Sequence, residues 1–237
     1  MIRFFGIMID ILLAPWRWMG ALIRQDRFVL KRPSCVQFIG IPGSGKTMGA
    51  VCMLYRTSMW KGKGKYKHAP IYGTEDAGLK IGKTIKTQDL CTHKFRNSLI
   101  LIDESSLNGL DAREWQGNFK GDKKNLLRQL KLHRHYGNSF ITTSQSANDN
   151  DSKIRDGIVS QTWIAHNKIS KVVCRRAIIW YKFDNGNYIL CIDEPSRFER
   201  IVNPYLSFGV KKKKYGKLYD SWATVPEIDK LPEYGIE

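Results

Sequence analysis

The sequence predicts an α/β fold with a central, mainly parallel β-sheet flanked by helices. Three observations indicate it: a glycine-rich loop between an apolar strand and a helix, a second apolar strand that ends in two acids, and a basic amphipathic helix that leads into a third strand. Alternating strands and helices are typical of parallel sheets, because a parallel connection crosses the sheet through a helix. The 237 residues suffice for one sizeable domain of this kind.

The first element is the apolar strand Cys35–Ile39 followed by the loop Gly40–Thr47, which fits the pattern G-x-x-x-x-G-K-[ST] without mismatch. In this pattern the glycines let backbone N–H groups point at a phosphate, the lysine reaches the β- and γ-phosphates, and the last hydroxyl holds Mg²⁺. A helix-compatible segment follows, so a phosphate would lie at a helix N-terminus. We therefore expect a P-loop NTPase that uses ATP and Mg²⁺. The predicted nucleotide-binding residues are Gly40, Pro42, Gly43, Ser44, Gly45, Lys46 and Thr47.

The second element is the apolar run Leu99–Ile102, which ends in Asp103 and Glu104. Open α/β sheets bind ligands at the carboxyl ends of their strands. Asp103 is predicted to hold Mg²⁺ together with Thr47. Glu104 is predicted to activate the attacking water as a general base, while Lys46 stabilises the transferred phosphate. The second acid favours an ATP-hydrolysing motor over a GTP-binding switch.

A competing strand also ends in two acids, Asp193 and Glu194. It follows the apolar segment Ile178–Phe183 and the turn residues 184–187, a pattern typical of a β-hairpin. A hairpin is antiparallel, whereas the acid-bearing strand of a P-loop fold runs parallel to the phosphate-loop strand. We therefore expect residues 172–194 to form a C-terminal β-hairpin and Asp103 and Glu104 to be the functional pair.

The third element is the amphipathic segment Asn125–His135, for which Gly137 is a natural C-terminal stop. The strand Ser139–Thr143 follows and leads to Gln145. Beside the acid-bearing strand, Gln145 is well placed to sense the γ-phosphate or to orient water; a glutamine in a surface loop is the alternative interpretation.

An arginine supplied by a neighbouring subunit would complete the site if the protein forms a ring. Arg155 is the preferred candidate, because it closely follows the strand that leads to Gln145. The other candidates are Arg113, Arg134 and Arg175.

The chain carries a formal net charge of +17, which favours nucleic acid or anionic lipid as a partner. The basic residues cluster in residues 61–68, 123–134, 175–176 and 211–214. Such clusters suit DNA binding through phosphates without sequence specificity. The five cysteines have no C-x-x-C spacing, which favours reduced thiols over disulfides or a zinc site.

The N-terminal segment Met1–Ile23 is strongly apolar, and its charges Arg3, Asp10, Arg17 and Arg24 recur every seven residues. On a helix this spacing places them on one stripe. An in-plane membrane anchor and a single span inside an oligomer are favoured, and a core helix is the alternative. The expected domains are an apolar membrane-associating helix at 1–26, the ATPase domain at 27–221 and a polar tail at 222–237.

Taken together, the motifs resemble the zonula occludens toxin-like family, which includes the assembly ATPases of filamentous phages. The resemblance covers residues 36–221 and rests on Gly40–Thr47, Ile102–Glu104, His133–Gly137, Ser144–Gln145 and Lys217–Ser221. Its broader relatives are the FtsK/HerA-like DNA pumps, including viral packaging ATPases. The apolar segment precedes the ATPase domain here, whereas these phage proteins place a span after it. This order favours an ATPase bound to a membrane or to a lipid-containing particle over a gate for an outer-membrane channel.

The resemblance implies an ATP-driven viral motor that translocates DNA during genome packaging or virion assembly and extrusion. We expect a homo-oligomeric ring that meets DNA, the membrane and other virion proteins. Its expected location is the host cytoplasm, at the inner membrane or on a membrane-containing virion. One alternative is an assembly ATPase that moves coat or membrane proteins without translocating DNA. A second is a membrane-bound structural protein with a degenerate nucleotide site, against which the intact Lys46, Asp103 and Glu104 argue.

Overall fold

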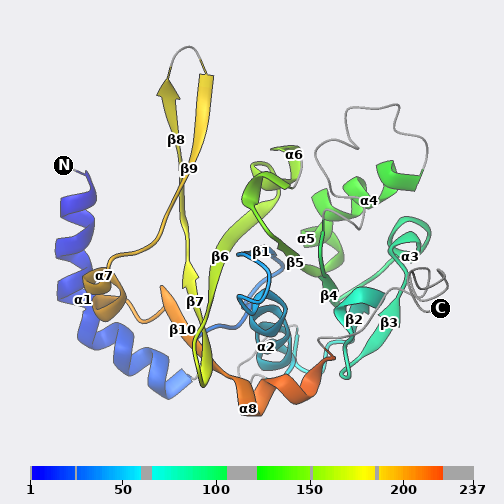
Figure 1. The fold of residues 1–237 in the computed structure, drawn as a ribbon, viewed down its shortest axis with the longest axis horizontal. Helices are drawn as coiled ribbons and strands as arrows, with labels where there is room; N and C mark the ends of the chain where they lie inside the picture. The colour runs from blue at the N-terminus through cyan, green and yellow to red at the C-terminus, as the bar shows by residue number, and fades with distance from the viewer. Residues whose placement is uncertain are drawn as a thin grey trace, which may run out of the picture.

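The computed structural model describes residues 2–24, 26–59, 66–105, 122–149, 152–184 and 187–220. Its main sheet contains β1 (Cys35–Ile39), β2 (Ile71–Thr74), β3 (Lys83–Ile85), β4 (Leu99–Ile102), β5 (Ser139–Ser144), β6 (Val159–Asn167), β7 (Lys171–Arg176) and β10 (Ser207–Lys211). In this part of the chain the strand order is β10-β7-β6-β1-β5-β4-β2-β3 (Figure 1). All neighbours from β6 to β3 pair in parallel, whereas β7 and β10 are antiparallel at one edge. The predicted mainly parallel sheet is confirmed.

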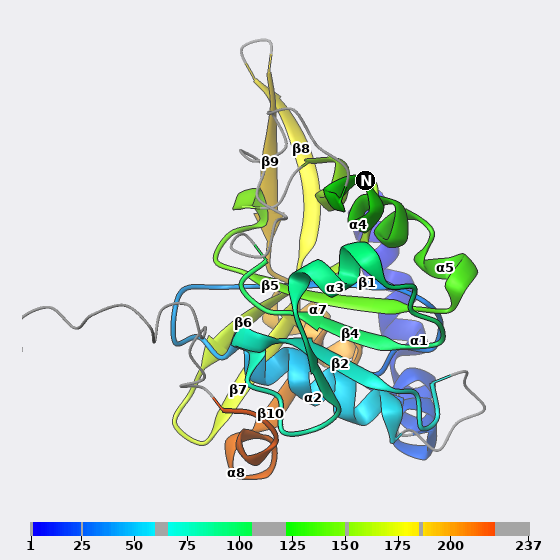
Figure 2. The ribbon, with the colours of Figure 1, turned by 90° about the vertical axis from the view of Figure 1, so that its right-hand side faces the viewer.

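Helices cover both faces of the sheet. They are α1 (Ile2–Arg24), α2 (Lys46–Ser58), α3 (Thr87–Thr92), α4 (Asp122–Lys131), α5 (His133–Tyr136), α6 (Ser152–Arg155), α7 (Arg197–Val202) and α8 (Lys212–Tyr215). Figure 2 shows α2 beneath the sheet and α3 and α4 above it. The segment predicted as one helix at 125–135 is two helices: α4 ends at Lys131, and α5 begins at His133. Gly137, with φ of 71°, caps α5 as the predicted C-terminal stop.

Alternation along the strands produces two cores. Neighbouring side chains of a strand point to opposite faces, so Val36 and Phe38 pack with buried residues of α2, whereas Cys35 packs on the other side. That second core includes Leu90 from α3 and Leu126 from α4. Burying a side chain of this size contributes about 1.5–3 kcal/mol to the free energy of unfolding. Strands that are buried on both faces have sequences that are nearly continuous apolar runs.

Residues 172–176 do not belong to the β-hairpin, and this part of the hairpin prediction is wrong. They lie in β7, where Val172 and Cys174 are buried against the α2 side of the main sheet. The hairpin itself is confirmed as β8 (Ile178–Asp184) paired with β9 (Asn187–Asp193), and it projects away from the sheet (Figure 1). The chain after Pro195 supplies α7, the edge strand β10 and α8.

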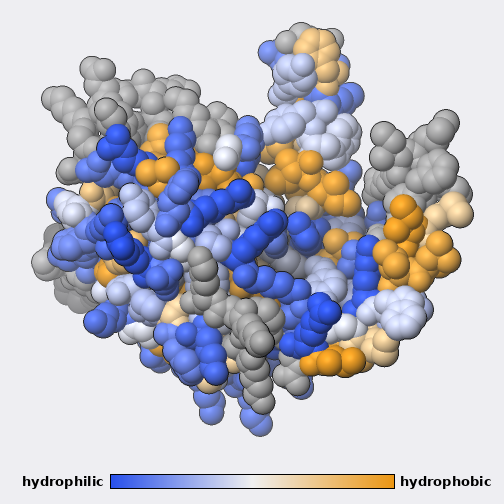
Figure 3. Space-filling model, turned by 180° about the vertical axis from the view of Figure 1, so that it is seen from behind, coloured by the Kyte–Doolittle hydropathy of each residue, from blue (hydrophilic) through white to orange (hydrophobic). Residues whose placement is uncertain are grey.

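Helix α1 lies beside α7 (Figure 1), and the Trp18 Nε1–H group donates to the Ile201 carbonyl at 2.7 Å. Ala21 is buried there, but most of the apolar side chains described on this helix are exposed (Figure 3). They are Met8, Ile9, Ile11, Leu12, Leu13, Trp16, Met19, Leu22 and Ile23. The interpretation of α1 as a core helix is therefore wrong.

No helix within the described ranges combines the length and the apolarity needed to cross a bilayer. The proposed tail at 222–237 lies outside the described residues, and the division into domains stays a prediction.

Gly49 sets the distance between α2 and the sheet. A Cβ atom there would lie 2.8 Å from Cys174 Sγ and 2.9 Å from Phe38 Cε1. We expect Gly49→Ala to lower the free energy of unfolding by about 1–3 kcal/mol through overpacking, measured by urea denaturation. Gly20→Ala is the matched control, because a Cβ there has no atom within 4 Å, and it should be neutral or stabilising. An equal loss in both variants would contradict this explanation.

Candidate functional site

The loop between β1 and α2 adopts a conformation that needs glycine. Gly43 and Gly45 have φ of 73° and 89°, in the left-handed region. A Cβ at Gly45 would lie 2.4 Å from Val172 Cγ2, so strand β7 also excludes a side chain at this position. Lys46 begins α2 directly after Gly45. The predicted order of strand, loop and helix is confirmed.

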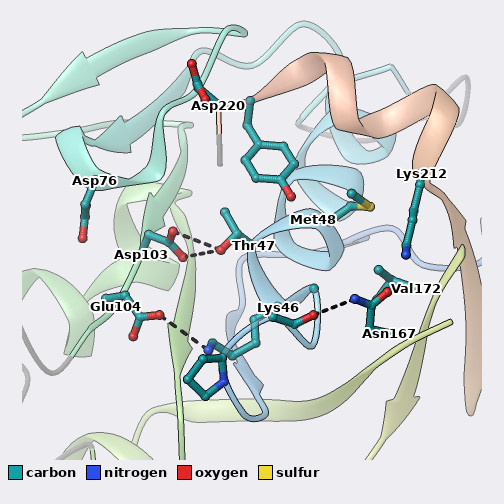
Figure 4. Close-up of a pocket in the computed structure, with 14 residues that line it drawn as sticks. Lys46, Thr47, Met48, Asp76, Asp103, Glu104, Asn167, Val172, Lys212 and Asp220 are labelled. Atoms are coloured by element: carbon teal, nitrogen blue, oxygen red, sulfur yellow. Dashed lines mark hydrogen bonds and ion pairs between the residues drawn. The ribbon is translucent and has the colours of Figure 1, made fainter. Parts of the chain in front are cut away.

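The loop borders a cavity of ≈ 480 Å³ (Figure 4). Of the seven predicted nucleotide-binding residues, Pro42, Gly43, Gly45, Lys46 and Thr47 line it. Gly40 and Ser44 support the loop from behind: the Gly40 N–H donates to the Gln145 carbonyl at 3.3 Å, and the Ser44 N–H donates to the Ile41 carbonyl at 3.1 Å. The first bond ties the start of the loop to the end of β5, and the second closes a turn inside the loop.

Asn167, at the end of β6, anchors the loop on its other side. Its Nδ2 amide donates to the Gly43 carbonyl at 2.8 Å (Figure 4). The sequence contained no signal for this residue, because an asparagine near a strand end is equally typical of an ordinary turn. Only the pairing of β6 with β1 brings it to the loop.

Asp103 lies at the centre of a hydrogen-bond network. The Thr47 hydroxyl lies 3.1 and 3.0 Å from its two carboxylate oxygens, and the Thr143 hydroxyl donates to Oδ1 at 2.5 Å. The Asp103 N–H donates to the Thr74 hydroxyl at 3.1 Å. Strand β4 is thus held at its carboxyl end by both neighbours, β2 and β5, and its acid points at the first turn of α2.

Glu104 lies beside Lys46, with 3.5 Å between its Oε1 and the lysine Nζ (Figure 4). Its φ of 39° lies in the left-handed region, which costs a non-glycine residue about 1 kcal/mol or more. The Thr143 hydroxyl accepts its N–H at 3.0 Å and holds this turn. The structure therefore brings together four predicted residues: Lys46, Thr47, Asp103 and Glu104.

Burial raises the pKa of Asp103 to about 7. The Thr143 hydrogen bond opposes this rise, the charge of Asp76 adds to it, the Thr47 hydrogen bond opposes it, and the charge of Glu104 adds to it. A cation bound at these oxygens would compensate for the cost of a buried carboxylate.

Asp76 follows β2 and lines the same cavity, as do Lys212 of α8 and the pair Tyr219 and Asp220. Sequence reasoning did not include Asp76 among the candidate site residues. The rule that led to Asp103, an acid just beyond the carboxyl end of a parallel strand, applies to Asp76 equally well. Lys212 was assigned to a DNA-binding cluster, whereas it lines the cavity.

The side chains of Gln145 and Arg155 lie elsewhere. Gln145 is exposed at the end of β5 and bonds the loop through its backbone carbonyl. Arg155 pairs with Asp156, with 2.7 Å between Nε and Oδ1, and donates to Asn148 Oδ1 at 2.9 Å. It lines a separate hollow with Arg176 and Tyr181. Within one chain neither side chain lines the loop cavity; a role for Arg155 in a neighbouring subunit's site stays a prediction. Arg113 lies outside the described residues.

The oxygen donors at this site fit Mg²⁺. Thr47 and Asp103 present a hydroxyl and a carboxylate, the hard ligands that Mg²⁺ prefers, with Asp76 nearby. Across the described ranges, no three His, Cys, Asp or Glu side chains form a complete metal cage. Mg²⁺ usually takes one or two carboxylates and completes its shell with water and substrate phosphates.

The raised pKa of Asp103 makes stability depend on pH. Its carboxyl group binds a proton more tightly in the folded protein than in the unfolded chain. Hence the free energy of unfolding should fall as pH rises from about 4 to about 7, by up to roughly 1.4 kcal/mol per unit from this group. We expect Asp103→Asn to remove this slope in urea titrations without nucleotide or metal. Asp193→Asn, on the projecting hairpin, should keep it; an unchanged slope in Asp103→Asn would contradict the assignment.

No family model and no curated protein matches the sequence. Among solved structures, the chain is similar to the N-terminal domain of zonular occludens toxin from Neisseria meningitidis, with 19% identity over 71% of this chain and 97% of that chain and a TM-score of 0.46. It is also similar to B204, the DNA-packaging ATPase of Sulfolobus turreted icosahedral virus, with 11% identity, 71% and 100% coverage and a TM-score of 0.42. A KaiC-like protein from Pyrococcus horikoshii OT3 matches with 12% identity, 68% and 90% coverage and a TM-score of 0.39. The chain's own strand order, phosphate loop and Thr47–Asp103 contact are those of a P-loop NTPase fold.

Proposed function

We propose that this chain is an ATP-hydrolysing motor that translocates DNA during packaging or assembly of a virion at a membrane. One observation carries the enzymatic part: Thr47 contacts Asp103 beside the Lys46–Glu104 pair, at the carboxyl ends of strands β1 and β4. The phosphate loop, Thr47, Asp103 and Glu104 all line one cavity, which supports the proposal that they bind a nucleotide and Mg²⁺ and supply a carboxylate base.

In the proposed reaction, a water molecule attacks the γ-phosphate of ATP in line with the leaving diphosphate. Lys46 and the backbone N–H groups of the loop would stabilise the charge on the phosphate oxygens. Thr47 and Asp103 would hold Mg²⁺, which would neutralise charge on the β- and γ-phosphates. Glu104 would orient the water and take its proton. The left-handed backbone at Glu104 directs this carboxylate to the lysine side of the cavity.

The net charge of +17 supports DNA as the polymer that the motor translocates. Among the described basic residues, Arg128 and Lys131 on α4 and Arg134 on α5 are exposed. They lie on the side of the sheet that α3 and α4 cover, so they can bind phosphates without blocking the nucleotide cavity. The motif resemblance described above supports the viral role.

A motor of this class would work as a ring in which an arginine from the neighbouring subunit completes each site, and Arg155 is the candidate.

The alternative function, an assembly ATPase for coat or membrane proteins, gains support from exposed apolar residues of the hairpin, including Trp180, Phe183 and Tyr188. Stimulation by DNA separates these two functions.

We also propose that α1 binds a lipid surface. Leu12, Trp16 and Ile23 are 74%, 68% and 76% exposed and lie on one face of the helix, at spacings of four and seven residues. The opposite face carries Trp18 and Ala21, which lie against the protein. The apolar stripe therefore points away from the domain, as an in-plane anchor requires.

Hydrolysis should depend on the paired residues of the site. We expect Lys46→Ala and Glu104→Gln each to lower steady-state ATP turnover by at least about 100-fold, because each removes transition-state charge stabilisation or the base. Asp193→Asn is the control, since it removes the acid of the competing strand, and it should retain wild-type turnover. Undiminished turnover in both site variants would refute the proposal.

DNA should stimulate the wild-type turnover, and the stimulation should fade between low and moderate salt, because phosphate contacts release counterions. Arg128→Ala together with Lys131→Ala should reduce the stimulation and leave the basal rate unchanged. Robust turnover that is indifferent to single- and double-stranded DNA would favour the protein-assembly alternative.

Lipid binding should depend on the exposed stripe of α1. We expect wild-type protein to float with vesicles of anionic phospholipid, and the triple variant Leu12→Ser, Trp16→Ser, Ile23→Ser to remain unbound. Ile169→Ser alters a fully exposed apolar residue in the β6–β7 turn and should float like the wild type. Equal flotation of all three proteins would exclude α1 as the lipid-binding element.

A further inference from the structure

The nucleotide cavity has two chemically different sides. Figure 4 shows the carboxylates Asp76, Asp103 and Glu104 on one side of Thr47, and Met48 and Lys212 on the other. Val172 lines the second side together with Lys212 (Figure 4). The acidic side suits a metal ion and the phosphates that share it, whereas the second side offers apolar surface and one ammonium group.

We propose that this second side is a nucleoside subsite, in which Met48, Val172, Lys212 and Tyr219 bind the base and ribose of the nucleotide. The inference rests on the proposed function, because it assumes that the triphosphate occupies the loop at Lys46. With the phosphates there and Mg²⁺ at Asp103, the rest of the nucleotide would extend away from Asp76, Asp103 and Glu104; Asp220 also lines the cavity, next to Tyr219. Met48 follows Thr47 directly on α2, so this surface begins beside the phosphate-binding residues.

Backbone pairing holds the C-terminal wall of this subsite. Tyr219 forms an isolated antiparallel bridge with Leu79. The Lys80 N–H donates to the Leu218 carbonyl at 2.9 Å, and the Asp220 N–H donates to the Gly78 carbonyl at 2.7 Å. Leu218 and Tyr219 also pack against the core on the α2 side. The ring of Tyr219 is therefore positioned before a ligand arrives, which lowers the entropic cost of binding.

Lys212 differs from the lysines around it. Its side chain is half-buried and points into the cavity, whereas Lys211, Lys213 and Lys214 are exposed (Figure 4). Within the described part of the chain, no carboxylate lies within ion-pair distance of its Nζ. Its three N–H donors are available for ribose hydroxyls. Met48 and Val172 offer the apolar surface that a flat heterocycle covers, and the methionine thioether contacts π-systems favourably.

Binding of Mg²⁺–ATP and of Mg²⁺–tripolyphosphate to the full chain tests the subsite, because tripolyphosphate has the phosphates without the nucleoside. We expect the wild type to bind ATP at least about tenfold more tightly in calorimetric titrations. Met48→Ala and Lys212→Ala should each weaken ATP binding by about tenfold and change tripolyphosphate binding less than twofold. Retained tripolyphosphate binding also reports that each variant is folded.

Matched controls are Met59→Ala, at the exposed end of α2, and Lys217→Ala, an exposed lysine of the same C-terminal segment, and both should bind like the wild type. Equal affinity of the wild type for ATP and tripolyphosphate, with neither ligand affected by Met48→Ala or Lys212→Ala, would overturn the subsite and leave the phosphate site intact. Failure of the wild type to bind either ligand would overturn the subsite together with the proposed function.

Discussion

The hydrogen bonds that hold Asp103 between α2 and the two strands beside β4 organise this molecule. Thr47 reaches the carboxylate from the helix, Thr143 from β5, and Thr74 accepts the backbone N–H from β2. A buried carboxylate without partners would cost several kcal/mol, so the bonds from Thr47 and Thr143 are needed to stabilise the acid, while Thr74 fixes the backbone at this position. Because Thr74 and Thr143 lie on the two parallel strands beside β4, a slip in strand register would separate them from Asp103, and the site depends on the pairing of these strands.

The same register decides how the two faces of the sheet are covered. Phe38 and Cys174 meet Gly49, which brings α2 close to β1 and β7 and carries the phosphate loop with it. The antiparallel strand β7 then closes the loop from the side, where Val172 leaves room only for glycine at position 45. The residues of the candidate site and the packing residues are thus parts of one arrangement, in which the contact between helix and sheet constrains the loop.

Much of the fold was predictable because apolar runs, glycines and acids occur in a fixed local order. The buried strands at 35–39 and 99–102, the glycine loop and the hairpin at 178–193 all carry their own signals. The acids at 103–104, which line the cavity, were separable from Asp193 and Glu194 because a hairpin cannot supply a parallel strand. Asn167 and Lys212 were not assigned to the cavity, since their local patterns fit a turn and a basic surface equally well. Residues 172–176 were misassigned for a related reason: the sequence pattern of an antiparallel strand is the same in a hairpin and at the edge of a larger sheet.

The sequence by itself determined the class of fold, the phosphate loop and the residues that line its floor, because these features depend on local backbone freedom and hydrophobic period. Tertiary structure alone decided which distant groups meet at the loop. It brought Asn167 from β6 and Lys212 from α8 to the cavity, and it left Gln145 and Arg155 outside it. It also turned the apolar stripe of α1 away from the domain. Such outcomes depend on the order of the strands and on which apolar surfaces are buried against each other. Residues far apart in the sequence decide both together, so no local pattern encodes them.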